Sequence, residues 1–121
     1  MRCKISSLYL CVKDMKRAIR FYEAFFEQEV TVKDEIYSVF EINGFRLGLF
    51  AYEKMNELHT FGSNCLPSIA VENVEVLRQK MNNLECCFPL TKIGTNWVTE
   101  FIDSEGNHME LTAPVDGEKI V

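Results

Sequence analysis

Residues 5–28 read ISSLYLCVKDMKRAIRFYEAFFEQ. Residues 5–12 alternate between two faces, which is the period of a half-buried strand. Asp14 then supplies a helix N-cap, because its carboxylate can accept hydrogen bonds from the free backbone N–H groups of a first turn. Apolar residues follow at three- and four-residue steps and predict an amphipathic helix over residues 14–28. The apolar stripe of this helix comprises Met15, Ala18, Tyr22 and Phe25.

Three strands should follow this helix, over residues 29–33, 36–42 and 45–50. Asn43-Gly44 separates the last two and is a strong hairpin signal, because both central positions of a type I′ turn need a positive φ. The first half of the chain is therefore predicted as β-α-β-β-β.

The second half of the chain repeats this order. Residues 67–71 alternate as residues 8–12 do, and Asn73 replaces Asp14 as an N-cap. A second apolar stripe predicts a helix over residues 73–83, and the matched face, cap and stripe indicate a repeat. The second stripe comprises Val74, Leu77, Met81 and Leu84.

We interpret the chain as one domain spanning residues 1–121. Module 1 covers about 4–51, a linker covers 52–65, and module 2 covers about 66–113. A half of roughly sixty residues would bury too little surface to be stable alone, so the modules should share one fold.

Composition excludes several classes of protein. The 121 residues are 47% hydrophobic and 26% charged, as in an ordered globular domain rather than a disordered chain. The net charge of -5 comes without a basic block, which argues against nucleic acid as a partner. No apolar run could span a membrane and no secretory signal is present, so we expect a cytoplasmic protein without a membrane partner. The five cysteines are odd in number and lack a Cys-x-x-Cys pair, which favours reduced thiols.

Motifs at both ends of the repeat resemble those of one known family. Residues 7–14 with residues 18–22 (AIRFY) resemble the opening strand, aspartate cap and Phe-Tyr helix of the vicinal oxygen chelate superfamily, and residues 101–111 (FIDSEGNHMEL) resemble its closing turn and terminal Glu-Leu. This superfamily includes glyoxalases, bleomycin-resistance proteins and extradiol dioxygenases. The resemblance implies an α+β fold in which two β-α-β-β-β modules form a curled mixed sheet with a concave cup and helices outside. It also implies a homodimer, whose modules pair within one chain or between chains.

Family enzymes hold a divalent cation in the cup with four side chains, usually His, Glu or Gln. The resemblance maps these positions onto Ser7, Gly48, Leu66 and Glu110. Only Glu110 is a credible ligand, since Gly48 and Leu66 offer no side-chain donor atom and a catalytic metal normally needs three protein ligands. We therefore expect no metal cofactor; the alternative is one divalent metal ion held by non-standard ligands.

Strand parity predicts which side chains line the cup. His108 and Glu110 are two apart on one strand, so both should face inward. If residues 103–106 form a four-residue hairpin loop, Phe101 lies opposite His108 and also faces inward. The predicted ligand-binding residues are Tyr9, Phe50, Trp97, Phe101, His108 and Glu110.

Each of these residues also has a structural interpretation. The aromatic side chains either stack on a flat organic ligand or fill the core, because pockets and cores use the same residues. His108 and Glu110 are either a two-ligand remnant of the metal site or an acid–base pair able to move a proton. Their structural interpretation is an ordinary hydrogen-bonded pair, or a histidine at the rim of the cup.

Three further side chains also have a functional and a structural interpretation. Cys11 is either a nucleophile or a small buried thiol. Arg46 either reaches an anionic ligand or pairs with Glu41 across the hairpin. His59, in the linker, is interpreted as a surface residue.

These observations favour a protein that binds a small neutral or cationic organic molecule without metal, as the resemblance to bleomycin-resistance proteins implies. The alternative is a metal-dependent lyase, isomerase or dioxygenase of the glyoxalase type, in which the metal acts as Lewis acid. A third class, a structural or regulatory dimer module, would fill the cup with its own side chains. The sequence identifies neither the ligand nor a catalytic residue.

Overall fold

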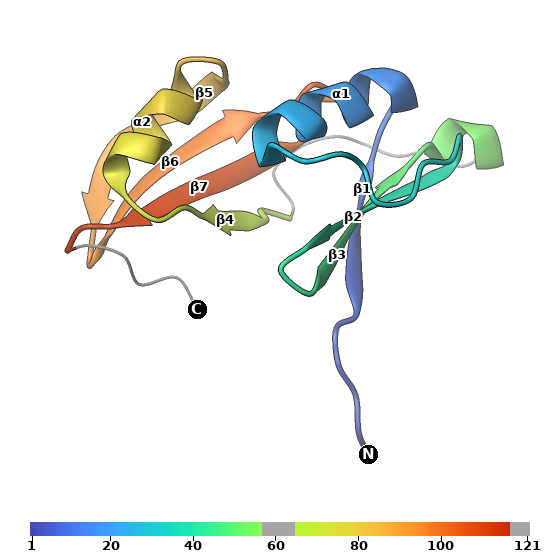
Figure 1. Cartoon of the computed structure of the whole chain (residues 1–121), viewed down its shortest axis with the longest axis horizontal. Coiled ribbons are helices and arrows are strands. Elements are labelled where there is room, and N and C mark those ends of the chain that lie inside the picture. Colours follow the sequence, from blue (N-terminus) through green and yellow to red (C-terminus); the bar gives the residue numbers. More distant parts are fainter. Residues whose placement is uncertain (57–64, 117–121) are drawn as a thin grey trace. The chain divides into compact units, whose positions relative to one another are not determined.

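The computed structural model describes residues 1–56 and 65–116. The chain forms two compact units, Met1–Phe61 and Gly62–Val121. Within the described ranges each unit combines one α-helix with one mixed sheet, so the predicted α+β class is confirmed (Figure 1). No helix in those ranges is long and apolar enough to cross a membrane.

The first unit contains a three-stranded sheet with strand order β1-β3-β2. Strand β1 runs parallel to β3, and β2 pairs with β3 antiparallel. The elements are β1 (Ser7–Cys11), α1 (Met15–Phe26), β2 (Tyr37–Ile42), β3 (Phe45–Phe50) and the 3-10 helix η1 (Tyr52–Met55).

Helix α1 forms for the reasons that its sequence predicts. The Asp14 carboxylate caps it by accepting from the Arg17 backbone N–H at 3.1 Å. The helix ends where Glu27 adopts a left-handed φ of 56°. Its inner face packs on the sheet, with the Tyr22 and Phe40 ring centroids 6.4 Å apart. The buried residues of α1 are Met15, Ala18, Ile19, Tyr22 and Phe25.

The Asn43-Gly44 hairpin is also confirmed. Asn43 has φ 47° and Gly44 has φ 84°, so both central residues adopt the positive φ that this turn requires. The two-residue turn places Ile42 opposite Phe45 and fixes the pairing of β2 with β3.

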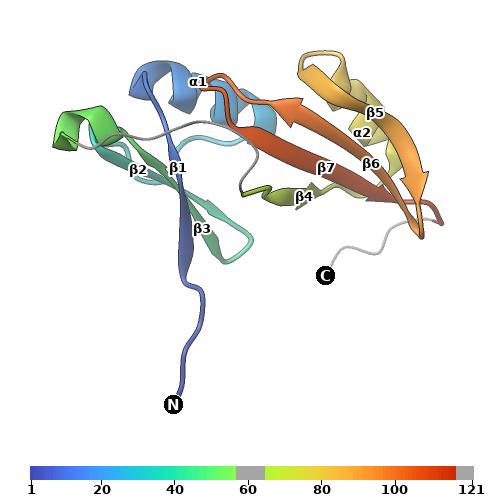
Figure 2. The ribbon, with the colours of Figure 1, turned by 180° about the vertical axis from the view of Figure 1, so that it is seen from behind.

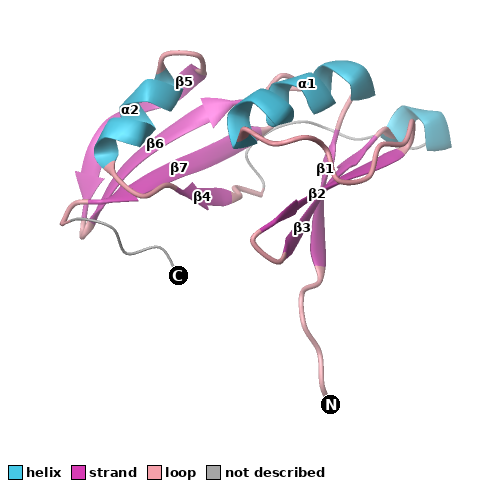
Figure 3. Cartoon of the chain, viewed as in Figure 1, coloured by secondary structure: helices cyan, strands magenta, loops and turns pink. Residues whose placement is uncertain are grey.

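The strand predicted over residues 29–33 is reduced to a single bridge between Val32 and Val39. The backbone N–H groups of Thr31 and Val32 both donate to the Val39 carbonyl, at 2.9 and 3.0 Å. The Thr31 hydroxyl then accepts from the Glu41 N–H at 2.9 Å. This side-chain acceptor replaces a carbonyl of a regular ladder, so the segment remains mostly loop (Figure 3).

The second unit has the predicted β-α-β-β-β order, in a four-stranded sheet arranged β4-β7-β6-β5. The Asn73 side chain caps α2 by accepting from the Val76 N–H at 2.9 Å. Helix α2 covers one face of this sheet, in front of the strands in Figure 1 and behind them in Figure 2. The elements are β4 (Ser68–Ala70), α2 (Val74–Met81), β5 (Glu85–Ile93), β6 (Asn96–Ile102) and β7 (His108–Pro114).

Hydrogen bonding divides the strands into two sheets, where the sequence predicted one curled sheet. In each unit one sheet face packs under its helix. We call the opposite side the helix-free face. On the first sheet it carries Ser7, Tyr9, Cys11, Tyr37, Val39, Glu41, Arg46, Gly48 and Phe50. On the second sheet it carries Ser68, Ala70, Val98, Glu100, Ile102, His108, Glu110 and Thr112.

Candidate functional site

Three aromatic side chains meet on the helix-free face of the first unit. Tyr9 and Phe50 lie there as predicted, and Tyr37 of β2 lies beside them. The Tyr37 and Phe50 rings stack with centroids 4.8 Å apart and an interplanar angle of 10°. Tyr9 meets Tyr37 edge-on at 5.9 Å and 78°. We call Tyr9, Tyr37 and Phe50 the aromatic cluster; Tyr37 is a residue that the sequence analysis missed.

The aromatic cluster is accessible. Tyr9 is 42% exposed and Tyr37 is 43% exposed, although both carry large apolar rings. Single exposed rings are common on protein surfaces, whereas adjoining exposed rings form an apolar patch of the kind that binds ligands. The cluster can therefore present ring faces and edges to a flat molecule.

The Tyr9 ring covers Gly48, its neighbour on β3. The two residues are Cα partners in the parallel ladder. A Cβ built on Gly48 would overlap Cδ1 and Cε1 of Tyr9. Glycine is therefore needed at position 48 so that the ring can lie over the strand at this point.

Two charged residues of this face, Glu41 and Arg46, pair with each other, which is the structural alternative given for Arg46 in the sequence analysis. Arg46 Nη1 lies 3.8 Å from Glu41 Oε1 across the hairpin, which is the predicted salt bridge. Both side chains are largely exposed, so the pair contributes little to stability. Cys11 is half-buried beside Phe50 at the end of β1.

The predicted pairing of Phe101 with His108 is wrong. Phe101 lies opposite Met109, and Ile102 lies opposite His108. The turn between β6 and β7 has one residue more than expected, because the Asp103 N–H donates to the Asn107 carbonyl at 2.8 Å and closes a wider loop. One residue of slip moves a side chain to the other face of a sheet.

This slip moves two predicted residues to the side of the sheet that faces the core. Phe101 is fully buried, and its partner Met109 is 1% exposed. Trp97 pairs with the buried Ala113 and shares the parity of Phe101. Phe101 and Trp97 therefore lie on the face opposite to His108 and Glu110.

His108 and Glu110 do lie on the helix-free face of the second unit, as predicted. Glu110 Oε1 accepts a hydrogen bond from the Ser68 hydroxyl at 2.7 Å. His108 Nδ1 lies 3.8 Å from the Cys87 sulfur. Glu110 thus contacts the neighbouring strand β4, whereas His108 on β7 lies near a side chain of β5, on the far side of β6.

Cys87, Glu100 and His108 form a cluster of potential metal ligands that the sequence analysis missed. Their ligand atoms all lie within 4.8 Å of one another. Burial raises the pKa of the Cys87 thiol, and the nearby Glu100 carboxylate raises it further. A bulge in β5 places Cys87 here: Cys86 pairs with Phe101 and Phe88 with Glu100, so Cys87 is the extra residue.

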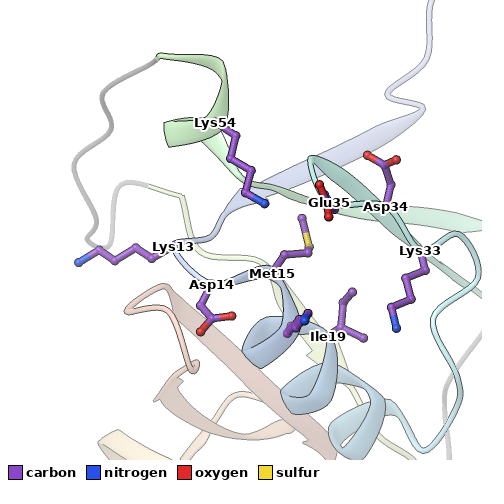
Figure 4. A pocket seen from close by; sticks show the side chains of 9 residues that line it. Lys13, Asp14, Met15, Ile19, Lys33, Asp34, Glu35 and Lys54 are labelled. Carbon is purple, nitrogen blue, oxygen red and sulfur yellow. The ribbon is translucent and has the colours of Figure 1, made fainter.

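A separate pocket of ≈ 580 Å³ opens on the first unit around the start of α1 (Figure 4). None of the predicted site residues lines it, and its charges are mixed. The carboxylates of Asp14 and Asp34 accept hydrogen bonds from backbone N–H groups. Hydrogen bonds from Ile36 and Tyr37 lower the pKa of Asp34. The lining residues are Lys13, Asp14, Met15, Lys16, Ile19, Lys33, Asp34, Glu35 and Lys54.

Two sequence predictions fall partly or wholly outside the described residues. His59 lies there, as does the middle of the predicted linker, 57–64.

Comparison with solved structures identifies the fold. A glyoxalase-related enzyme from Fulvimarina pelagi superposes with a TM-score of 0.77 at 11% identity, covering 98% of this chain and 96% of that one. A glyoxalase/bleomycin resistance protein/dioxygenase from Nocardioides gives 0.73 at 18% identity, over 100% and 89% of the two chains. The chain has the glyoxalase/bleomycin-resistance fold. A lactoylglutathione lyase from Agrobacterium tumefaciens also matches, with a TM-score of 0.72 at 14% identity over 93% and 94%.

No protein-family model matches the sequence, and no curated protein is significantly similar to it. At these identities the structural matches define a fold and carry no activity to this chain.

The sequence resemblance maps the family's four metal-ligand positions onto Ser7, Gly48, Leu66 and Glu110. Gly48 is covered by the Tyr9 ring, and Leu66 is an exposed apolar residue. Ser7 offers a neutral hydroxyl, which is a weak ligand beside carboxylates and imidazoles. Glu110 is the one strong donor among the four positions, below the three that a catalytic ion needs.

Proposed function

We propose that this protein binds a flat organic molecule on its aromatic cluster and does so without the divalent metal of the glyoxalase/bleomycin-resistance fold. The observation that carries the proposal is the placement of Tyr9. Its ring occupies the space above Gly48. The sequence resemblance maps Gly48 onto a metal-ligand position of the family, so on that mapping an aromatic side chain covers a position that would otherwise carry a ligand.

The geometry of the cluster favours planar ligands that are neutral or positively charged. Tyr37 and Phe50 are nearly parallel, so a flat molecule can continue their stack. Ring faces carry partial negative charge and attract cations. Binding of this kind suits a protein that sequesters a small molecule, because sequestration needs no reacting group on the protein.

His108 and Glu110 lie on the second unit, and we propose them separately from the aromatic cluster, as polar groups for a ligand of that unit. The carboxylate of Glu110 suits a cationic group, and its hydrogen bond from Ser68 fixes the carboxylate in place.

The proposal is tested by fluorescence titration with the planar cation proflavine in the presence of EDTA. Tyr37→Leu removes a ring from the cluster and keeps an apolar side chain. It should weaken binding by about 1 kcal/mol, roughly fivefold in Kd.

Phe45→Leu is the matched control. Phe45 is 41% exposed, as Tyr37 is 43% exposed, yet it lies on β3 with the parity of the opposite face. Its replacement should leave the affinity unchanged. Equal affinities for wild type and Tyr37→Leu, or binding that requires added metal, would overturn the proposal.

A further inference from the structure

The helix-free face of the second unit brings together a thiol, a carboxylate and an imidazole from three different strands. Cys87 comes from β5, Glu100 from β6 and His108 from β7. Strand β6 lies between the other two, so the side chains converge over its surface. We propose that Cys87, Glu100 and His108 bind one divalent cation of the zinc class.

The separations suit a tetrahedral ion. Zinc binds sulfur at about 2.3 Å and nitrogen at about 2.0–2.1 Å, so two such ligands on a tetrahedral ion lie about 3.6 Å apart. The Cys87 sulfur and His108 Nδ1 lie 3.8 Å apart. Since the three ligand atoms are all within 4.8 Å of one another, small rotamer adjustments close the site.

The ligand chemistry selects among metals. A thiolate and an imidazole favour zinc and related transition ions, whereas magnesium and calcium prefer oxygen ligands alone. Three protein ligands also leave one position for water or for an oxygen of a bound molecule, which is the arrangement of catalytic rather than structural zinc.

The surrounding charges favour a cation. Glu100 lies directly opposite Glu110 in the β6–β7 ladder, and like charges at such positions repel. A divalent ion on Glu100 would relieve this repulsion. Cys87 and Glu100 would supply negative charge, and neutral His108 would supply a nitrogen lone pair.

The bulge gives the site a structural cause. In β5 the pairing shifts between Cys86 and Phe88, so Cys87 and Phe88 both lie against Glu100. Bulges commonly redirect a side chain beside a functional site. Without the bulge, Cys87 would pair with a single residue of β6, as in a regular ladder.

This inference goes beyond the proposed function. It is independent of binding at the aromatic cluster, because none of its three ligands belongs to that cluster, and it gives His108 the role of a metal ligand in place of a polar anchor. A zinc-class ion here would provide the Lewis acid that the alternative, metal-dependent prediction requires.

The test uses the whole chain, kept reduced with a phosphine that does not chelate metals. Co²⁺ is titrated as a zinc probe, and the charge-transfer absorption of a cobalt–thiolate bond reports sulfur ligation. Zn²⁺ is then added in competition. Cys87→Ser removes the proposed ligand, and Cys86→Ser is the matched control, since Cys86 pairs with Phe101 outside the cluster.

We expect one cobalt ion per chain and the thiolate band in wild type and Cys86→Ser, displaced by zinc. Cys87→Ser should lose the band. Glu100→Gln keeps the shape of the side chain and should weaken zinc binding by at least about 10-fold, as removal of groups that support a metal does.

Three results would overturn the proposal: no stoichiometric binding by wild type, a band that survives in Cys87→Ser, or equal losses in the two cysteine variants. Circular dichroism establishes that each variant is folded. If Cys87→Ser does not fold, Glu100→Gln decides, and unchanged zinc affinity in that variant refutes the site. Because proflavine binding is measured in EDTA, its result does not depend on a metal ion. Failure of the metal site and failure of the proposed ligand binding are therefore recognised separately.

Discussion

Gly48→Ala tests whether the Tyr9 ring truly fills the space above β3. The added Cβ would overlap Cδ1 and Cε1 of Tyr9 and lie 2.8 Å from Cγ. Carbon atoms normally approach to about 3.5–4.0 Å, so the ring must move. Because Tyr9 is 42% exposed, the ring can turn outward without a shift of the backbone.

The size of the effect follows from three contributions. Displacement of the ring removes its edge contact with Tyr37, worth about 0.5–1.5 kcal/mol. The crowding around the new Cβ that remains after the ring moves should cost about 1 kcal/mol, which is the low end of the usual range for overpacking. Against these, alanine in place of glycine stabilises by about 0.4–1 kcal/mol through the unfolded chain. The free energy of unfolding should therefore fall by about 1 kcal/mol.

Urea unfolding of four proteins checks this value: wild type, Gly48→Ala, Tyr9→Ala and the double variant. When Tyr9 is already alanine, the obstruction is gone and only the effect on the unfolded chain remains. Gly48→Ala should then be neutral or stabilising by up to about 1 kcal/mol, so its sign reverses. An equal loss in both backgrounds would show that the ring does not lie over Gly48.

Two further predictions concern carboxylates. Asp103→Ala should lower the free energy of unfolding, measured in urea, by about 1–3 kcal/mol, because the buried Glu105 N–H and the partly buried Asn107 N–H lose their acceptor. Asp116 is exposed, so Asp116→Ala should change the free energy of unfolding by less than about 0.5 kcal/mol. Asp34 has a lowered pKa in the folded protein, chiefly through hydrogen bonds from Ile36 and Tyr37, so its stabilising effect is present above its unfolded pKa and is lost as the pH falls through its folded pKa. Asp34→Asn should thus be less stable than wild type near neutral pH, and the difference in the free energy of unfolding should close in acid. A difference that does not depend on pH would contradict the assignment.

Local chemistry explains why much of the fold could be predicted from the sequence. The N-caps Asp14 and Asn73 act within one helical turn, and the Asn43-Gly44 hairpin is encoded in two residues. Such signals do not depend on distant parts of the chain. The strand expected over residues 29–33 failed because Thr31 substitutes its hydroxyl for a backbone acceptor, a choice that its sequence does not reveal.

The second-unit site was harder to predict because its register depends on a side chain. The Asp103 carboxylate accepts from the Glu105 and Asn107 backbone N–H groups, both at 2.8 Å, and this widens the loop by one residue. Because of that extra residue, Glu100 and not Phe101 lies on the helix-free face. Proline inside a strand often marks a bulge, so Pro89 is a sequence signal for irregular pairing in β5, but it does not locate the bulge at Cys87.

Tyr37 could have been identified from the sequence. A two-residue turn at Asn43-Gly44 fixes the register of both strands, which places Tyr37 opposite Phe50. Counting outward from that turn therefore completes the aromatic cluster.

The most direct measurement of the central claim is a set of intermolecular nuclear Overhauser effects between bound proflavine and the protein, recorded in EDTA. The account predicts contacts from the ligand ring protons to the ring protons of Tyr9 and Tyr37. Contacts confined to other residues, or contacts to these rings that appear only after a divalent metal is added, would contradict metal-free binding at the aromatic cluster.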